Sequence, residues 1–250
     1  AKIAHELSSL VEAEDEYDKE AIDILAKWDG SHKHESKAPI VYEKLLYHTI
    51  HIAMKDKIDS AHLQEFFNTH LVKSSLDKLI HNDASVWWDD LTTEERETRK
   101  QVVNRAFKLS LKELTDQLGA IKNWKWGNVH TLEHPHPLGQ VALLKPFFNI
   151  GTFKMDAADG VLNKLAYIRD GSGEYKIKTG PSTRRLINFA DVENSLSILP
   201  TGQSGNPLSD HYNDQAELYA KGKWRKMLMN KTEIEQNSTN TLILNRLEKN

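Results

Sequence analysis

The sequence predicts an α+β fold, in which a helical region is followed by largely antiparallel strands. Apolar residues recur near a 3.6-residue period from about residue 7 to residue 118. Eleven of the twelve glycines and six of the seven prolines lie at or beyond Gly119, and such residues end helices and form turns. We therefore expect a single segment over 1–250, with helices over 7–120, strands and a last helix over 121–230, and a polar tail over 231–250.

Four helices are expected in the first part of the chain. The first ends near Gly30, and the others cover about 39–57, 60–80 and 93–118. Ser60 is the expected N-cap of the third helix, because its hydroxyl can accept a backbone N–H of the first turn. Thr92 or Thr93 is the expected N-cap of the fourth, which would then carry glutamates in its first turn.

Short apolar runs separated by turn signals predict strands in the second part. These runs are 165–170, 175–179, 185–190 and 195–200. The tetrapeptide DGSG at 170–173 is a good hairpin connection between the first two runs. A last helix is expected from Ser209, as its N-cap, to Gly222.

Net charge and hydropathy argue against two classes of binding partner, nucleic acids and membranes. The formal net charge is −3, so the chain has no basic excess with which to bind a polyphosphate, and we expect no nucleic-acid partner. No run approaches the length of a membrane-spanning helix, and we expect no membrane partner. The first twenty residues do not resemble a signal peptide. The sequence has no cysteine, which excludes disulfides and thiolate metal sites.

The segment HTLEH at 130–134 matches the H-x-x-E-H pattern of one class of zinc peptidase. That pattern works on a helix, where two histidines four residues apart share one face. Pro135 follows directly and disfavours helical backbone at His134, so we expect an extended segment without zinc. The loops GSHKHES (30–36) and GTFKMDAADG (151–160) also lack the spacing of a metal site.

The stretch LPTGQSGNPLSDHYNDQ at 199–215 contains the residue types of a hydrolytic triad. Ser204, His211 and Asp214 lie within eleven residues of one another. GQSG differs from the G-x-S-x-G turn of hydrolases, because its second glycine follows the serine directly. Side chains of this kind near a turn more often cap backbone groups than catalyse. Geometry rather than spacing defines a triad, so the residues alone leave both interpretations open.

Read as a pattern, the same stretch resembles the C-terminal signature of the penicillin acylase (penicillin amidase) family of N-terminal-nucleophile hydrolases. Three further blocks agree in order: LAKWDG at 25–30, WKWGNVHTLEHPHPLG at 124–139 and GPSTRRLINFAD at 180–191. The resemblance spans about residues 20–230. The residues that carry it outside the first block are Trp126, Gly127, His130, His136, Gly180, Pro181, Gly202, Gln203, Ser204, Gly205, Ser209, His211, Tyr212, Asp214 and Gln215.

The resemblance implies a place in a four-layered α-β-β-α sandwich and hydrolysis of linear amides, such as the side chains of β-lactams or other N-acyl compounds. A role in antibiotic biosynthesis and a periplasmic or secreted location are implied in the same way. In that family a serine at the N-terminus of the large chain is the nucleophile and its own amine is the base. An asparagine and backbone N–H groups stabilise the oxyanion.

Several family features have no counterpart in this sequence. Residue 1 is alanine, which has no hydroxyl, and the nucleophile, the oxyanion asparagine and the calcium ligands of the family lie upstream of the matching blocks. We therefore expect the C-terminal segment of a large subunit, inactive alone, without a catalytic residue or cofactor of its own. Its expected partners are the remainder of the same enzyme and a small amide substrate.

One position is carried over from the family to a site near the substrate. Relatives that cleave cephalosporins or acyl lactones have an acidic residue where this chain has Asn188, and an amide cannot act as an acid. Arg184 and Arg185 lie close by and are expected to pair with carboxylates, either structurally or at the edge of the substrate. Two alternatives stay open: a stand-alone binding module derived from this fold, and the zinc hydrolase considered above. The isolated segment is expected to self-associate through unpaired strand edges.

Overall fold

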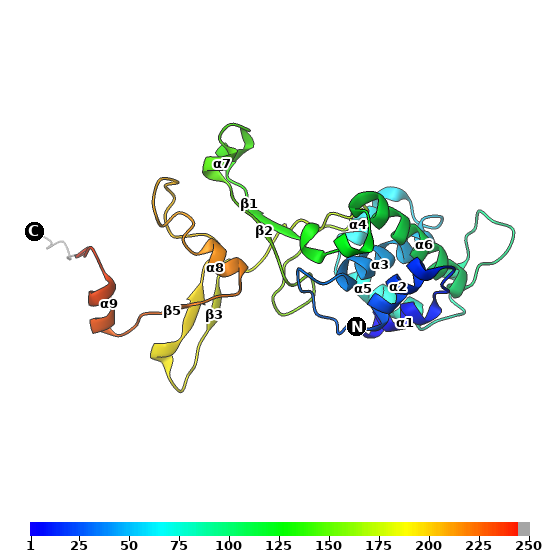
Figure 1. Ribbon diagram of the computed structural model, residues 1–250, viewed down its shortest axis with the longest axis horizontal. Coiled ribbons are helices and arrows are strands. Elements are labelled where there is room, and N and C mark those ends of the chain that lie inside the picture. Colours follow the sequence, from blue (N-terminus) through cyan, green and yellow to red (C-terminus); the bar gives the residue numbers. More distant parts are fainter. Residues whose placement is uncertain (245–250) are drawn as a thin grey trace, which may run out of the picture. The chain divides into compact units, whose positions relative to one another are not determined.

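The computed structural model describes residues 1–244, which fall into two compact units, Ala1–Pro181 and the part from Ser182 onward. The first unit mixes helices with one two-stranded sheet, and the second contains a three-stranded sheet (Figure 1). All three strand pairings are antiparallel. The predicted α+β class, with helices before largely antiparallel strands, is confirmed. No helix in the described part is long and apolar enough to cross a membrane.

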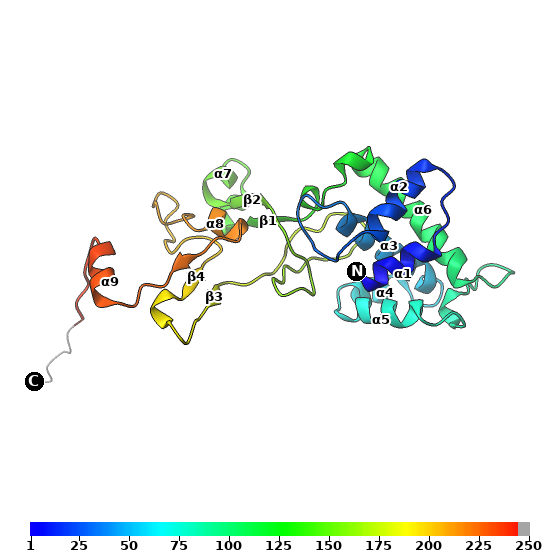
Figure 2. The ribbon, with the colours of Figure 1, turned by 60° about the horizontal axis from the view of Figure 1, so that its bottom comes forward.

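Helices dominate the first unit (Figure 2). They are α1 (Lys2–Leu10), α2 (Glu16–Ala26), α3 (Ala38–Met54), α4 (Ser60–Phe67), α5 (Leu71–Ile80) and α6 (Arg99–Leu118). Helix α3 is the centre of this unit, with 15 of its 17 residues buried. A helix that is apolar on all sides is stable only when neighbours cover every side. Helices α2, α5 and α6 pack against α3.

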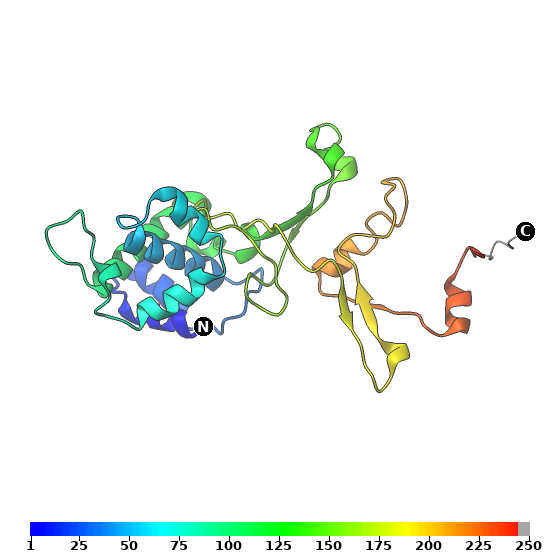
Figure 3. The ribbon, with the colours of Figure 1, turned by 180° about the vertical axis from the view of Figure 1, so that it is seen from behind.

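A β-hairpin extends from the helices of the first unit (Figure 3). Strand β1 (Thr131–His134) pairs antiparallel with β2 (Ile150–Lys154), and the short helix α7 (Lys145–Phe148) lies in the connection. The first unit also contains single helical turns: η1 (Val86–Trp88), η2 (Ile121–Asn123), η3 (Trp126–Asn128) and η4 (Pro137–Gln140). Residues 155–181 then pack back onto the helices without forming a regular strand.

The second unit is built on a three-stranded sheet of order β3-β4-β5. Its elements are β3 (Arg184–Leu186), η5 (Val192–Asn194), β4 (Leu196–Ile198), α8 (Ala216–Ala220), β5 (Arg225–Lys226) and α9 (Lys231–Asn237). Arg184 pairs with Ile198 and Leu186 with Leu196, so the connection between these residues closes an antiparallel hairpin. Strands β3 and β5 form the two edges of this sheet.

Several helices begin or end at other residues than predicted, because other side chains cap them. Asp59, and not Ser60, caps α4, because its carboxylate accepts the backbone N–H groups of residues 61 and 62. The predicted helix over 60–80 is interrupted after Phe67 and resumes as α5. The fourth predicted helix begins six residues late. Its cap is Thr98, which forms a reciprocal capping box with Gln101, whereas Thr93 bonds within the preceding loop.

The first predicted helix is two helices, α1 and α2, and Asp15 caps the second of them. The runs 165–170 and 175–179 are not strands, although alternate side chains along both are buried. Their backbone groups bond to two different partners: Ala166 exchanges bonds with residues 178 and 179, while Tyr175 donates to Val129. Ala166 and Thr179 form one isolated bridge, and Tyr175 and Ile177 each donate a single bond to the segment 129–131, so these runs form no regular ladder.

The helix predicted from Ser209 to Gly222 is shortened to α8, which begins at Ala216 after Gln215. The Ser209 hydroxyl caps only a turn, by accepting the backbone N–H of His211 at 3.2 Å. The Gln215 N–H donates to Thr201 across the chain, at 3.0 Å, instead of to a carbonyl one helical turn earlier. The tail over 231–250 contains α9 (Lys231–Asn237), and its last six residues lie outside the described part.

Candidate functional site

The corner formed by residues 199–215 connects β4 to α8 in the second unit. The backbone carbonyl of His211 accepts two hydrogen bonds, from the N–H groups of Gln203 at 2.9 Å and Ser204 at 3.0 Å. Gly202 lies against this carbonyl so closely that a Cβ there would come within 2.0 Å of the His211 oxygen. Only glycine fits this approach, so the first glycine of GQSG is required by the turn itself.

Gln215 closes the corner at its other end. This side chain is only 7% exposed, and its Oε1 accepts the backbone N–H of Leu199 at 3.1 Å. The Gln215 N–H in turn donates to the Thr201 carbonyl. One glutamine therefore ties the end of β4 to the start of α8, which explains why a long polar side chain stands at this position.

The two serines of the corner serve the backbone. Ser204 Oγ accepts the N–H of Asn206 at 3.1 Å, and Ser209 Oγ accepts the N–H of His211. The Tyr212 N–H donates to the Ser209 carbonyl at 3.0 Å. Within residues 1–244, no hydrogen bond joins either hydroxyl to the imidazole of His211. The arrangement lacks the bond between nucleophile and base that a triad needs.

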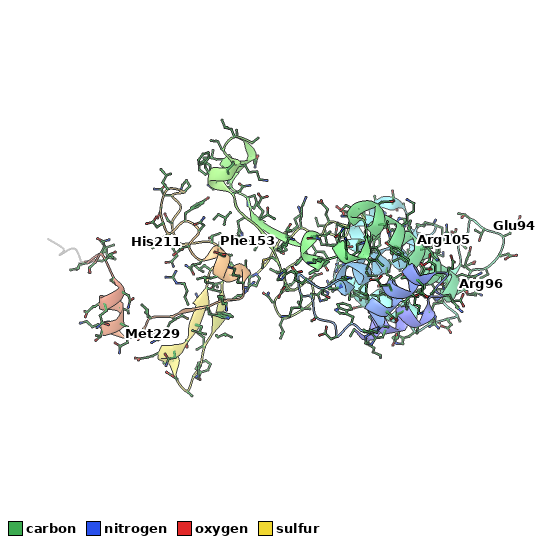
Figure 4. The ribbon with its side chains drawn as sticks, in the orientation of Figure 1. Glu94, Arg96, Arg105, Phe153, His211 and Met229 are labelled. Atoms are coloured by element: carbon green, nitrogen blue, oxygen red, sulfur yellow. The ribbon has the colours of Figure 1, made fainter. Side chains whose placement is uncertain are left out.

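Asp214 contacts two basic side chains beside these turns. His211 Nδ1 lies 3.3 Å from Asp214 Oδ2, and the same oxygen lies 3.2 Å from Arg225 Nη1. The His211 side chain is 74% exposed, and Figure 4 labels it on the loop before α8. Together with Gln203, Ser204 and Ser209, these groups line a shallow cavity of about 490 Å³. They link the corner to β5 by an exposed ion pair, an interaction of small energy.

The three residues predicted near the substrate lie on and just after β3. Arg184 packs against Tyr219 of α8, with its Nη1 donating to the Tyr219 carbonyl at 2.9 Å. Arg185 is exposed. Asn188 is also exposed and forms a turn, because its Oδ1 accepts the N–H of Ala190 at 3.1 Å. The structure thus brings Arg184 to α8 and leaves the other two at the surface, and their roles at a substrate stay predictions.

The block around Trp126 lies in the first unit and supports its core. Trp126 is fully buried, and its indole N–H donates to the carbonyl of Ala157 at 2.9 Å. His130 stacks on this indole with 4.6 Å between ring centroids. Gly127 leaves room for the backbone of His34, whose carbonyl accepts the glycine N–H at 2.8 Å. These motif residues therefore hold distant segments together.

His130 is a buried neutral histidine. Its Nδ1 donates to the carbonyl of Tyr175 at 2.8 Å, which fixes the tautomer because a carbonyl only accepts. Burial lowers the pKa of His130 to about 4, although the bond to Tyr175 opposes this shift. His136, at the end of the block, stacks on Phe148 at 4.9 Å and accepts the N–H of Leu138 with its Nδ1. Gly180 is exposed, and Pro181 is the last residue of the first unit.

The zinc pattern HTLEH forms strand β1, as expected from Pro135. Its Glu133 pairs with Lys145 at 3.0 Å and accepts a bond from Asn149 at 3.2 Å. In the described part of the chain, no three His, Cys, Asp or Glu side chains come together in a group that would hold a metal ion. The extended backbone expected for this segment is confirmed, and the helix that this pattern requires is absent from it.

Sequence reasoning missed the buried charges of the first unit. Glu43 of α3 is fully buried and accepts the Nε–H of Arg169 at 2.8 Å, while the next residue, Lys44, pairs with Glu113 of α6. The signal was a pair of charges inside the apolar run PIVYEKLLY. These groups contact residues 169–171 and α6, and they serve the packing of the first unit.

Comparison with known proteins gives this arrangement its context. The family model described as penicillin amidase matches residues 1–236. The chain belongs to the penicillin amidase family. A relative named acyl-homoserine lactone acylase QuiP, from Pseudomonas aeruginosa, is 25% identical over 237 residues, which cover 87% of this chain and 28% of that protein. Its namesake from Pseudomonas putida is 29% identical over 154 residues, 59% of this chain and 18% of that protein.

A solved structure of a penicillin G acylase has a similar fold. The thermostable penicillin G acylase from Alcaligenes faecalis superposes with a TM-score of 0.53 at 14% identity, over 99% of this chain and 46% of that chain. The likeness to the penicillin acylase fold that the sequence motifs imply is thereby confirmed. This chain spans about 28% of the length of the Pseudomonas aeruginosa relative, so most of that protein lies outside the matched part.

Proposed function

We propose that this chain is the C-terminal segment of an amidohydrolase that cleaves linear amides of N-acyl compounds, with N-acyl-homoserine lactones and β-lactam side chains as the first candidates. The observation that carries the proposal is the family match over 1–236 together with relatives named acyl-homoserine lactone acylases. In this proposal the nucleophile and the oxyanion groups belong to the rest of the enzyme. The segment supplies a rigid part of the scaffold around them, outside the cytoplasm.

The contacts of the corner support a scaffold role. The hydroxyls of Ser204 and Ser209 accept backbone N–H groups, and His211 is bound only to Asp214 among the described side chains. A polar turn of this kind positions strands and helices without taking part in proton transfer. Exposed apolar residues in the second unit also support a covering partner: Phe189 is 90% exposed and Leu208 is 88% exposed.

The proposal is tested by assaying two proteins side by side. One is the full-length protein that includes this chain, and the other is chain 1–250 alone. Each is incubated with N-acyl-homoserine lactones of different acyl length and with penicillin G, and the released amine is quantified. We expect hydrolysis by the full-length protein only. Hydrolysis by chain 1–250 above the buffer rate would contradict the scaffold role, and no hydrolysis by either would contradict the assigned reaction.

A further inference from the structure

The Arg184 side chain is fixed against α8 by two contacts with one residue. Its Nη1 donates to the Tyr219 carbonyl, and the guanidinium carbon lies 3.6 Å from the centroid of the Tyr219 ring. A cation held over an aromatic face in this way has little freedom to turn. The Tyr219 ring is itself buried, with 2% of its surface exposed. One face and one nitrogen of the guanidinium are thus used inside the second unit.

The other two nitrogens of Arg184 lack a hydrogen-bond acceptor within the described part of the chain. Both Nε and Nη2 are buried, and neither has a hydrogen-bond partner among residues 1–244. Burial lowers the pKa of Arg184, and the interactions that oppose this shift come from Tyr219 rather than from a carboxylate. Buried polar atoms normally have partners, and a buried charge without a counter-ion is strongly disfavoured.

The two unpaired nitrogens form one edge of the guanidinium. Their N–H bonds point the same way, at a spacing that fits the two oxygens of a carboxylate. A neutral carbonyl or amide oxygen would supply no counter-charge for the buried guanidinium. We propose that this edge of Arg184 binds a carboxylate in bidentate fashion, and that an Asp or Glu side chain from the rest of the enzyme supplies it. This inference rests on the proposed function, in which the chain is one segment of a larger protein.

A side chain fits this position better than a free acid. The Nε and Nη2 atoms are closed to solvent, so a diffusing carboxylate would have to open the structure before reaching them. A side chain would be enclosed as the two parts of the enzyme fold together. Arg185 offers a natural comparison, since it is the next residue of β3 and is exposed. Successive side chains of a strand point to opposite faces, so Arg185 does not share the position.

Hydrogen–deuterium exchange in two contexts tests the proposal. Arg184→Lys keeps the charge and removes the fork, and Arg185→Lys is the matched control. In the full-length protein we expect Arg184→Lys to speed exchange about tenfold or more in peptides covering β3 and α8, since bonds to a charged group are lost. Arg185→Lys should leave those peptides unchanged. In chain 1–250 the effect of Arg184→Lys should be less than about threefold, because only the contact with Tyr219 changes.

An equal effect of Arg184→Lys in both contexts would overturn the proposal, because the role of the side chain would then end at Tyr219. A second measurement identifies the source of the carboxylate in the unmodified chain 1–250. The Nε–H signal of Arg184 is followed by NMR during titration with sodium acetate, against sodium chloride at equal ionic strength. We expect no saturable shift, and a saturable shift would replace the side chain by a free acid. Neither readout depends on amide hydrolysis, so a failure of the proposed reaction would be recognised separately.

Discussion

Replacement of Glu43 by glutamine is expected to destabilise the helical unit severely. The carboxylate is fully buried in α3, with its Oε2 2.8 Å from Nε of Arg169 and its Oε1 3.5 Å from Nζ of Lys73. Arg169 is itself only 3% exposed. Glutamine has nearly the same shape as glutamate, so the packing is retained while the charge is lost. Arg169 would then lose its closest counter-ion and keep only Asp159, whose Oδ2 lies 3.5 Å from Arg169 Nη1.

The magnitude follows from the pKa of Glu43. Burial alone raises this pKa, but the charges of Arg169 and Lys73 and the hydrogen bond from Arg169 outweigh burial and lower it from 4.5 to about 2. A difference of this size corresponds to roughly 3 kcal/mol of stability at neutral pH. Removal of one partner from other buried ion pairs costs a similar amount, about 3–5 kcal/mol. The unfolded carboxyl loses its proton near pH 4.5, so this contribution is complete above about pH 5 and is lost as the pH falls towards 2.

Urea unfolding at pH 7 provides the assay. Circular dichroism reports the helices, and the matched control is Glu95→Gln, at an exposed glutamate of the loop before α6. We expect Glu43→Gln to lower the free energy of unfolding by about 3 kcal/mol, and Glu95→Gln to change it by less than about 0.5 kcal/mol. The gap between wild type and Glu43→Gln should narrow below pH 4.5. If the two variants unfold at the same urea concentration, Glu43 is not paired as described.

Three further outcomes are expected. Gly202→Ala should disrupt the turn at residues 199–215, since its Cβ would lie 2.0 Å from the His211 carbonyl oxygen, and limited proteolysis in this segment should become faster. Gly205→Ala is the control, because a Cβ there meets nothing within 4 Å, and its proteolysis rate should stay unchanged. Ser204→Ala in the full-length protein should keep kcat/KM within about threefold of wild type, because the Ser204 Oγ accepts only a backbone N–H. If Ser204 were the nucleophile, the same substitution would lower kcat/KM about a thousandfold or more. His130 should titrate near pH 4 by NMR, and a midpoint near 6.5 would contradict its burial. An unfolded histidine takes up its proton near pH 6.5, so the free energy of unfolding should fall as the pH drops from 6.5 towards 4.

The sequence predicted the helices better than their ends. The apolar period located the central helix over 39–57, because burial on all sides leaves a long run of apolar residues. The start of α6 was misplaced, since Thr93 and Thr98 are both suitable caps and only the second has a glutamine three residues later. That reciprocal pair was readable in the sequence, and it outweighs the glutamates that precede it.

The candidate site shows a sharper limit. The motif 199–215 was visible as a corner, because glycine, proline and short polar residues determine turns locally. The contact of Arg184 with Tyr219 joins residues 35 positions apart, and the pair of Glu43 with Arg169 joins residues 126 apart. No periodicity or spacing encodes such pairs, since they depend on which elements the fold places together. The buried charged residues of this chain therefore could not be paired from the sequence alone.

The pairing of α3 with residues 169–171 has a consequence for how the protein is made. Glu43 leaves the ribosome long before Arg169, its closest counter-ion, which lies 126 residues further along the chain. At about 5–20 residues per second, the interval is roughly 6–25 s. During that time the buried helix α3 carries a carboxylate whose closest counter-ion has not yet been made. The newly made helices of the first unit therefore cannot complete their packing, and remain accessible to chaperones, until the last part of this unit has emerged.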